Sequence, residues 1–257
     1  MRHNRLQLNS AKTEFIWCTT SRRQHQVAKE PFHVGSDTVQ PASVVRNLGL
    51  FIDEELSMQD HITNLVRTCF SILRQLKSIK RSLPQDTTKL LIHSFITSRI
   101  DYCNVAFAGL PRSTLLRVQS VLNAAARLVC NARKFDHITP LLRDQLHWLR
   151  TPERVQYKLC LLTYKSLHDL APSYLSGAIT PLSSVSSRQR LRSSQSFDVA
   201  VPRTRTSIGN RAFCVAGPKA WNSLAPDVRS AESIGSFKRL LKTQLFRQSY
   251  DIPTSTS

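Results

Sequence analysis

Residues 58–84 read MQDHITNLVRTCFSILRQLKSIKRSLP, and their apolar side chains recur at intervals of three and four. That spacing predicts an amphipathic helix, because residues three or four apart lie on one helical face. The apolar face consists of Ile62, Leu65, Val66, Cys69, Ile72, Leu73 and Leu76. The other faces carry Arg67, Arg74, Lys77, Lys80 and Arg81. Pro84 should end the helix, since proline lacks the backbone N–H that a helix interior requires.

Two further helices are expected downstream. Asp86 can cap the first by accepting a hydrogen bond from a free backbone N–H, and this helix should stop before Gly109. Its expected apolar side is formed by Leu90, Leu91, Phe95 and Ile96. Ser113 can cap the second helix in the same way. The apolar stripe of that helix consists of Leu115, Val118, Leu122, Ala125 and Val129.

The C-terminal half contains two more helix starts. Thr139-Pro140 and Thr151-Pro152 each place a hydroxyl before a proline, which is typical of a capped first turn. The second of these helices should run to about Leu167. Eight Ser and five Arg between residues 183 and 207 then indicate a flexible basic segment. A terminal helix should carry Phe237, Leu240, Leu241 and Leu245.

Upstream of residue 56 the pattern is strand-like. Short apolar runs at 13–18, 32–34 and 47–52 are separated by polar turns, which is typical of β-strands. The sequence therefore predicts a mostly helical α+β chain, with a small sheet, a basic helical region and a helical C-terminal region. Trp148, Trp221, Phe213 and Phe237 are expected to fill the core.

The charge of the chain points to a polyanionic partner, either nucleic acid or an acidic membrane face. Thirty-six Lys and Arg against 17 Asp and Glu leave a net charge of +19 on 257 residues, which is more than solubility requires. Residues 64–134 hold twelve of the basic residues and only Asp86 and Asp101 as acids, a local surplus of +10. This surplus favours nucleic-acid contact by the helical region.

Other function classes find little support. No apolar run reaches about 18 residues and no signal-peptide core follows Met1, so an intracellular location, cytoplasmic or nuclear or both, is expected. The six cysteines never pair as Cys-x-x-Cys and are expected to be buried, reduced thiols. Asp53-Glu54-Glu55 is an acidic run without further convergent ligands, so no metal site is expected. No catalytic signature or Gly-rich phosphate loop occurs either.

Many short blocks resemble one family. LQLNSAKTE at 6–14 looks like the late-palm motif of non-LTR (LINE-type, jockey-like) retrotransposon reverse transcriptases, and NLGLFID at 47–53 looks like the primer-grip strand that follows it. Blocks similar to the thumb and post-thumb region are IDYCN (100–104), QSVLNAAAR (119–127), FDHITP (135–140), LHWL (146–149), YKSLH (164–168), LAPSYL (170–175), VPRTR (201–205) and WNSLAP (221–226). The blocks occur in the same order as in the family, and together they span nearly the whole chain.

The resemblance implies a division of the chain. Residues 1–56 would be a remnant of the palm with its primer-grip strands, and 57–135 a helical thumb. Post-thumb helices would follow at 136–182, the flexible Arg/Ser-rich segment at 183–211, and a Trp motif with a final helix at 212–257.

The resemblance also implies that this chain alone does not polymerise. In the family, palm aspartates that include a Tyr-x-Asp-Asp turn hold two Mg²⁺ ions over the reacting groups, and these residues are expected upstream of Met1. This chain is therefore expected to carry no cofactor. Lys12 matches a family lysine that helps to protonate the leaving pyrophosphate, and without the palm site it should be idle.

Thumb helices of the family lie along the primer–template duplex, so the expected partners are RNA and RNA–DNA duplex, contacted without sequence specificity. The candidate phosphate-binding residues are Arg67, Arg74, Lys77, Lys80, Arg81, Arg117, Arg127, Arg188, Arg190 and Arg192. The Arg-rich segment from Arg188 to Arg205 can add contacts to single-stranded RNA; a plain linker is an equally open reading.

Two alternatives to a truncated, nucleic-acid-binding reverse transcriptase remain at this stage. The chain can be a coding relic with no selected activity, or one piece of an active polymerase whose upstream exons are missing. Translation of the DNA immediately upstream separates them, because an in-frame Tyr-x-Asp-Asp region favours the missing-exon reading and stop codons favour a relic.

Overall fold

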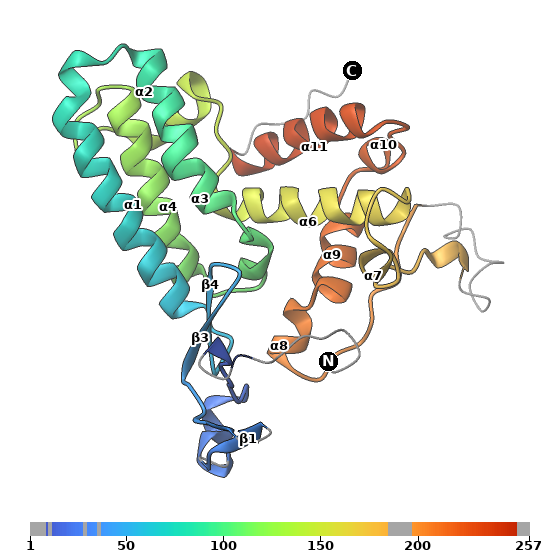
Figure 1. Cartoon of the computed structure of the whole chain (residues 1–257). Helices are drawn as coiled ribbons and strands as arrows, with labels where there is room; N and C mark the ends of the chain where they lie inside the picture. The colour runs from blue at the N-terminus through green and yellow to red at the C-terminus, as the bar shows by residue number, and fades with distance from the viewer. Residues whose placement is uncertain (1–8, 10–11, 28–29, 35–36, 185–196, 251–257) are drawn as a thin grey trace. The chain divides into compact units, whose positions relative to one another are not determined.

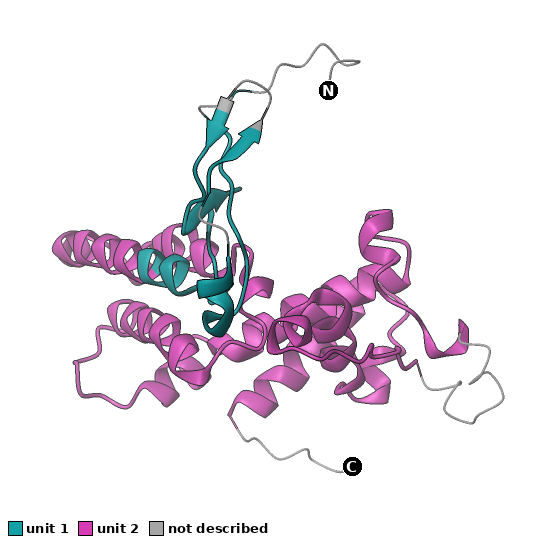
Figure 2. Ribbon diagram, turned by 90° about the horizontal axis from the view of Figure 1, so that it is seen from below, with its two compact units in different colours: residues 1–65 teal, residues 66–257 magenta. Residues whose placement is uncertain are grey.

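The computed structural model describes residues 9, 12–27, 30–34, 37–184 and 197–250. The chain forms two compact units, residues 1–65 and residues 66–257 (Figure 2). The boundary between them falls within the first long helix. The described residues are mostly helical, with two small pairs of antiparallel strands, so the predicted α+β, mostly α class is confirmed.

Unit 1 contains a 3₁₀ helix at Ser21–Gln26 and four short strands. Strands β1 (Phe32–Val34) and β2 (Asp37–Val39) pair antiparallel, and so do β3 (Val44–Asn47) and β4 (Leu50–Asp53). The ring of Phe15 stacks on Phe32 at 5.1 Å between centroids. The predicted strand at 32–34 is confirmed as β1.

The strand prediction at 13–18 is wrong, and that at 47–52 is confirmed only for residues 50–52, which belong to β4. The run 47–52 is not one strand, because Leu48 and Gly49 adopt positive φ values of 46° and 87° and reverse the chain between β3 and β4. Two consecutive positive φ angles match the right-handed twist of paired strands, which is why such turns are common in hairpins. In the run 13–18, Phe15 forms a single isolated bridge with Pro41.

Helix α1 spans Gln59–Ile79 and is followed by a 3₁₀ turn, Lys80–Ser82. The apolar face predicted from residues 58–84 is confirmed. Its buried members are Ile62, Leu65, Cys69, Leu73 and Leu76. The α-helix ends five residues before Pro84, because its last residues tighten into the 3₁₀ turn.

A longer helical segment follows, made of α2 (Gln85–Ile92), a π turn (His93–Thr97) and α3 (Ser98–Asp101). Its buried face differs from the predicted one: Leu90 and Phe95 are 65% and 46% exposed. The buried residues are Thr88, Ile92, Ile96, Thr97 and Ile100, so the prediction is confirmed for Ile96. Apart from Thr97 they lie four residues apart, and the π turn, wider than an α turn, keeps this spacing on one side of the helix.

Helix α4 (Arg112–Val129) carries the predicted stripe, with Val118, Leu122, Ala125 and Val129 buried and Leu115 half-buried. The predicted caps are wrong, because each helix begins one or two residues earlier. Pro84 precedes α2 and Pro111 precedes α4, both in extended backbone, so Asp86 and Ser113 lie within the first turn. A short helix α5 (Ile138–Pro140), followed by a π turn at Leu141–Gln145, likewise places Thr139 inside the helix.

Helix α6 (Thr151–Leu167) ends where the sequence predicts, but its first turn is satisfied by a distant residue. The side-chain Oε1 of Gln119, on α4, accepts hydrogen bonds from Thr151 N at 2.8 Å and from Thr151 Oγ1 at 3.1 Å. The Thr151 hydroxyl therefore donates to α4 instead of capping its own helix.

The C-terminal core is built around α6, which lies between α9 (Phe213–Asn222) and α11 (Ile234–Ser249) (Figure 1). Tyr164 stacks on Phe237 at 4.3 Å, and Trp221 donates from Nε1 to the Phe197 carbonyl at 2.6 Å. Trp148, Trp221 and Phe237 are buried and Phe213 packs against this core, so the core prediction for these aromatics is confirmed. Short helices complete the region: α7 (Ser173–Ser176), α8 (Ser207–Arg211) and α10 (Pro226–Arg229).

Part of the segment expected to be flexible, 183–211, is described and makes specific contacts. Asn222 bonds to both backbone groups of Val199, and Asp198 forms an ion pair with Arg229. Arg211, at the end of α8, donates to the carbonyls of Ala108 and Ala106 at 3.1 and 3.2 Å. Within the described ranges, no helix combines the length and apolar character needed to cross a membrane.

Candidate nucleic-acid interface

Helix α1 places three predicted phosphate-binding residues along one line. Arg67 and Arg74 are seven residues apart, close to two full turns, and Lys77 follows one turn later. Arg67 and Arg74 lie on the side opposite the buried Cys69 and Leu73, and Lys77 lies at the edge of the buried face, one turn after Leu73. The line from Arg67 to Lys77 covers about 15 Å at 1.5 Å per residue. Because the apolar side chains of α1 face the core, its arginine and lysine side chains remain exposed to solvent.

The accessibility of these side chains fits contact with a polyanion. Arg67, Arg74, Lys77 and Arg81 are exposed, and Lys80 is half-buried. In the part of the chain that the structure describes, the ion pairs are Arg143–Asp144, Arg154–Asp101 and Arg229–Asp198. None of them engages Arg74, Lys77, Lys80 or Arg81, so no carboxylate of the described residues compensates these four charges. We call Arg67, Arg74, Lys77, Lys80 and Arg81 the α1 basic stripe.

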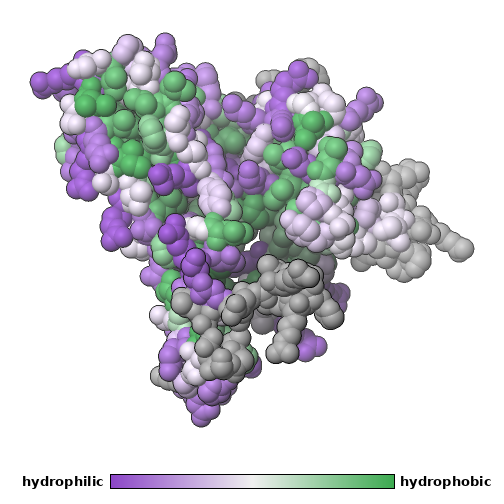
Figure 3. Space-filling model, viewed as in Figure 1, coloured by the Kyte–Doolittle hydropathy of each residue, from purple (hydrophilic) through white to green (hydrophobic). Residues whose placement is uncertain are grey.

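The surface of the helical region is not purely cationic. Figure 3 shows hydrophilic side chains along the outer edge on the α1 side, with apolar surface beside them. The exposed apolar side chains of the segments α1 to α4 are Ile79, Leu90, Phe95, Tyr102 and Leu116.

The remaining basic candidates are placed differently. Arg117 and Arg127 lie on α4 and are half-buried. Arg127 donates to the Asp136 carbonyl at 3.3 Å, and its Nε is buried without a partner among the described residues. It therefore holds the loop after α4 in place. Arg188, Arg190 and Arg192 lie outside the described residues.

Two residues considered for catalysis or metal binding, Lys12 and Asp53, lie in unit 1. Lys12 is exposed, next to the Asn9 turn. Asp53 is buried and its Oδ1 accepts a hydrogen bond from Ser57 N at 2.6 Å, so it closes the turn that leads into α1. Burial lowers the pKa of His61, whose Nδ1 accepts from Phe51 N at 3.4 Å. Among the described residues, no three His, Cys, Asp or Glu side chains are grouped to hold a metal.

The cysteines differ in accessibility, with Cys130 and Cys214 half-buried between the two extremes. Cys69 and Cys160 are fully buried, and burial raises the pKa of their thiols to about 11 and about 12. Cys18 and Cys103 are exposed, so the prediction of burial is wrong for these two. All six are free thiols, and the two buried ones stay protonated and unreactive at neutral pH.

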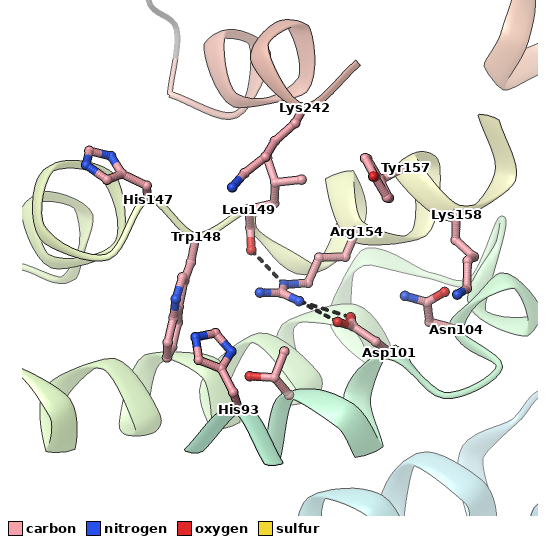
Figure 4. Close-up of a pocket in the computed structure, with 11 residues that line it drawn as sticks. His93, Asp101, Asn104, His147, Trp148, Leu149, Arg154, Tyr157, Lys158 and Lys242 are labelled. Atoms are coloured by element: carbon pink, nitrogen blue, oxygen red, sulfur yellow. Dashed lines mark hydrogen bonds and ion pairs between the residues drawn. The ribbon is translucent and has the colours of Figure 1, made fainter. Parts of the chain in front are cut away.

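Sequence reasoning missed a cavity of about 350 Å³ in unit 2. Its walls come from the α2–α3 segment, residues 147–149, α6 and α11 (Figure 4). The residues that line it are His93, Thr97, Asp101, Asn104, His147, Trp148, Leu149, Arg154, Tyr157, Lys158 and Lys242. Because they come from segments up to about 150 residues apart, no local sequence signal could have identified the site.

Comparison with known proteins returns no match: no family model, no curated protein and no solved structure is similar to this chain.

Proposed function

We propose that this chain derives from a non-LTR retrotransposon reverse transcriptase and binds RNA and RNA–DNA duplex through the α1 basic stripe, without polymerising on its own. The observation that carries the binding proposal is that Arg74, Lys77 and Arg81 are exposed and that no described carboxylate compensates them. The family assignment rests on the resemblance of the sequence blocks.

The stripe suits phosphate recognition rather than base recognition. Lysine and arginine on one helical line contact a charged backbone, which fixes the position of a duplex but carries no sequence information. Arg81, beyond the end of α1, extends the line to fourteen residues from Arg67. In this proposal the segment from α1 to α4 corresponds to a polymerase thumb, and β1–β4 to the remnant of the palm with its primer-grip strands.

The proposal includes no catalysis by this chain. The sequence contains no Tyr-x-Asp-Asp and no pair of adjacent aspartates. Two metal ions on such carboxylates are what stabilise the transferred phosphoryl group in this chemistry. Lys12 is in this view inherited from the parent enzyme and idle.

The test is the salt dependence of binding to a fluorescent RNA–DNA hybrid, measured with the whole chain. Each phosphate contact contributes about 0.9 to the slope of log K against log salt concentration. Replacing Arg74, Lys77 and Arg81 by alanine should lower that slope by about 2.7 and weaken binding to hybrids of every sequence.

A matched control removes three exposed charges from α11 instead, by alanine at Lys238, Arg239 and Arg247. Circular dichroism verifies that both variants remain folded. An equal loss in the two variants would mean that net charge alone drives binding, and the assignment of α1 as the interface would be wrong.

A further inference from the structure

The cavity between the α2–α3 segment, α6 and α11 is lined by an excess of positive charge. Arg154, Lys158 and Lys242 contribute three cations, and Asp101 is the one carboxylate among the residues that line it. Asp101 is already matched, because Nη1 of Arg154 lies 2.7 and 3.0 Å from its two oxygens. Arg154 is further fixed by donating from Nε to the Leu149 carbonyl at 3.0 Å.

Lys158 and Lys242 also line the cavity. Lys242 extends from α11 toward Leu149, and Lys158 extends from α6 toward Asn104 (Figure 4). Neither takes part in an ion pair within the described ranges. Two ammonium groups in the lining of one cavity favour a ligand that carries negative charge.

Two buried polar side chains on the cavity wall have no hydrogen-bond partner in the described structure. Thr97 is 8% exposed and Asn104 is 3% exposed, and their Oγ1 and Oδ1 atoms bond to nothing. Buried polar atoms in folded proteins nearly always have a partner. Asn104 Oδ1 accepts only, so the missing partner is a donor such as a hydroxyl group.

Part of the lining is aromatic. The His93 ring meets the Trp148 ring edge-on at 5.4 Å. Burial, helped by the charges of Arg154 and Lys89 and opposed by Asp101, lowers the pKa of His93. The ring is therefore neutral at pH 7 and offers one donor and one acceptor.

We propose that this cavity binds a phosphate monoester of a small polyhydroxy compound, with the phosphate attracted by the positive charges of Lys158 and Lys242 and a hydroxyl donating to Asn104 Oδ1. Lysines bind phosphate as point charges, and the volume lies at the small end of the range for ligand pockets. A sugar phosphate and a nucleoside monophosphate share this chemistry. The site uses no residue of the α1 basic stripe, so the test of this proposal is independent of the test of the proposed function.

Isothermal titration of the whole chain with ribose 5-phosphate tests the site, with ribose and inorganic phosphate as the two partial ligands. We expect ribose 5-phosphate to bind at least tenfold more tightly than either. Lys158→Ala combined with Lys242→Ala should weaken it at least tenfold, whereas Lys238→Ala, an exposed change on α11 outside the cavity, should leave it unchanged.

The Asn104→Ala variant distinguishes the contribution of the ligand's hydroxyl groups from that of its phosphate. It should weaken binding of ribose 5-phosphate and leave that of inorganic phosphate as it was. Tighter binding of adenosine 5′-monophosphate than of ribose 5-phosphate would support the site and identify a nucleotide as its occupant.

Three results would overturn the proposal: no binding of ribose 5-phosphate at millimolar concentration, equal affinity for inorganic phosphate, or equal loss in the Lys238 variant and in the double-lysine variant. The alanine variant at Arg74, Lys77 and Arg81 should retain the binding of ribose 5-phosphate, which keeps this result independent of nucleic-acid binding.

Discussion

At the residue scale, Gly109 shows how one position links distant parts of unit 2. Its φ of +66° lies in the left-handed region, and a Cβ there would meet Cγ of Arg211 at 2.9 Å. The Arg211 guanidinium is held by the carbonyls of Ala108 and Ala106. Gly109, which the sequence predicts to lie just beyond a helix end, therefore also leaves space for the Arg211 side chain from α8.

We predict that Gly109→Ala lowers the free energy of unfolding by about 1–2 kcal/mol, the usual cost of left-handed backbone for a residue with a Cβ. Urea denaturation followed by circular dichroism measures it. Gly235→Ala is the control, because Gly235 has helical backbone near the start of α11 and its Cβ would meet only Ser233 Oγ at 4.0 Å. Should both variants be equally stable, neither backbone strain nor Arg211 matters at Gly109.

At the scale of elements, α6 and α9 approach each other closely because α9 has a glycine at the crossing. A Cβ on Gly217 would lie 2.8 Å from Thr163 Oγ1 on α6 and 3.1 Å from the Phe213 ring. Thr163 is fully buried and donates to the Leu159 carbonyl at 3.0 Å. This hydrogen bond fixes the position of the threonine hydroxyl against α9.

We therefore expect Gly217→Ala to destabilise the chain by about 1–3 kcal/mol, the range for overpacking a core, even though alanine favours helix more than glycine does. Thr163→Ala in the same chain should relieve the clash. A double-mutant cycle measures the coupling between the two positions. A coupling energy near zero would show that the helices separate freely and that Gly217 does not set their distance.

At the scale of the whole molecule, charge repulsion opposes folding. The chain carries +19, and the described ion pairs engage only Arg143, Arg154 and Arg229 among its many cations. At low salt these like charges repel over a Debye length of roughly 30 Å at 0.01 M, and at 0.15 M over about 8 Å.

We predict that the melting temperature rises between 0.01 and 0.15 M NaCl, by about 2–4 °C for each kcal/mol of repulsion that is screened. Differential scanning fluorimetry measures it. The triple alanine variants on α1 and on α11 should both melt higher than the parent at low salt and respond less to added salt. A melting temperature that falls with salt would mean that attractive pairs dominate.

Much of the fold could be predicted from local pattern. The buried face of α1, the stripe of α4, the end of α6 at Leu167 and the core aromatics follow from the spacing of apolar residues, because burial of one face drives each helix into the core. The basic stripe follows from the same periodicity, since it is what remains on the exposed side of α1.

The errors share a cause, which is that the deciding partner is remote in sequence. Thr151 carries the local signature of a cap, yet Gln119 satisfies that helix end from 32 residues upstream. Leu90 and Phe95 resemble core residues, yet they are exposed, and the π turn at His93–Thr97 buries Ile92 together with the predicted Ile96. Leu48-Gly49 looked like the middle of a strand and is the turn of a hairpin.

The sequence by itself determined the class of the chain, the helices whose apolar faces repeat, and the cationic line on α1, because each of these depends on periodicity within one segment. Only the tertiary structure decided the cavity with its two orphaned polar atoms, the pairing of Asp101 with Arg154 and the close crossing of α6 and α9. Those features arise where segments distant in the chain are packed together, and local spacing carries no information about which of them will meet.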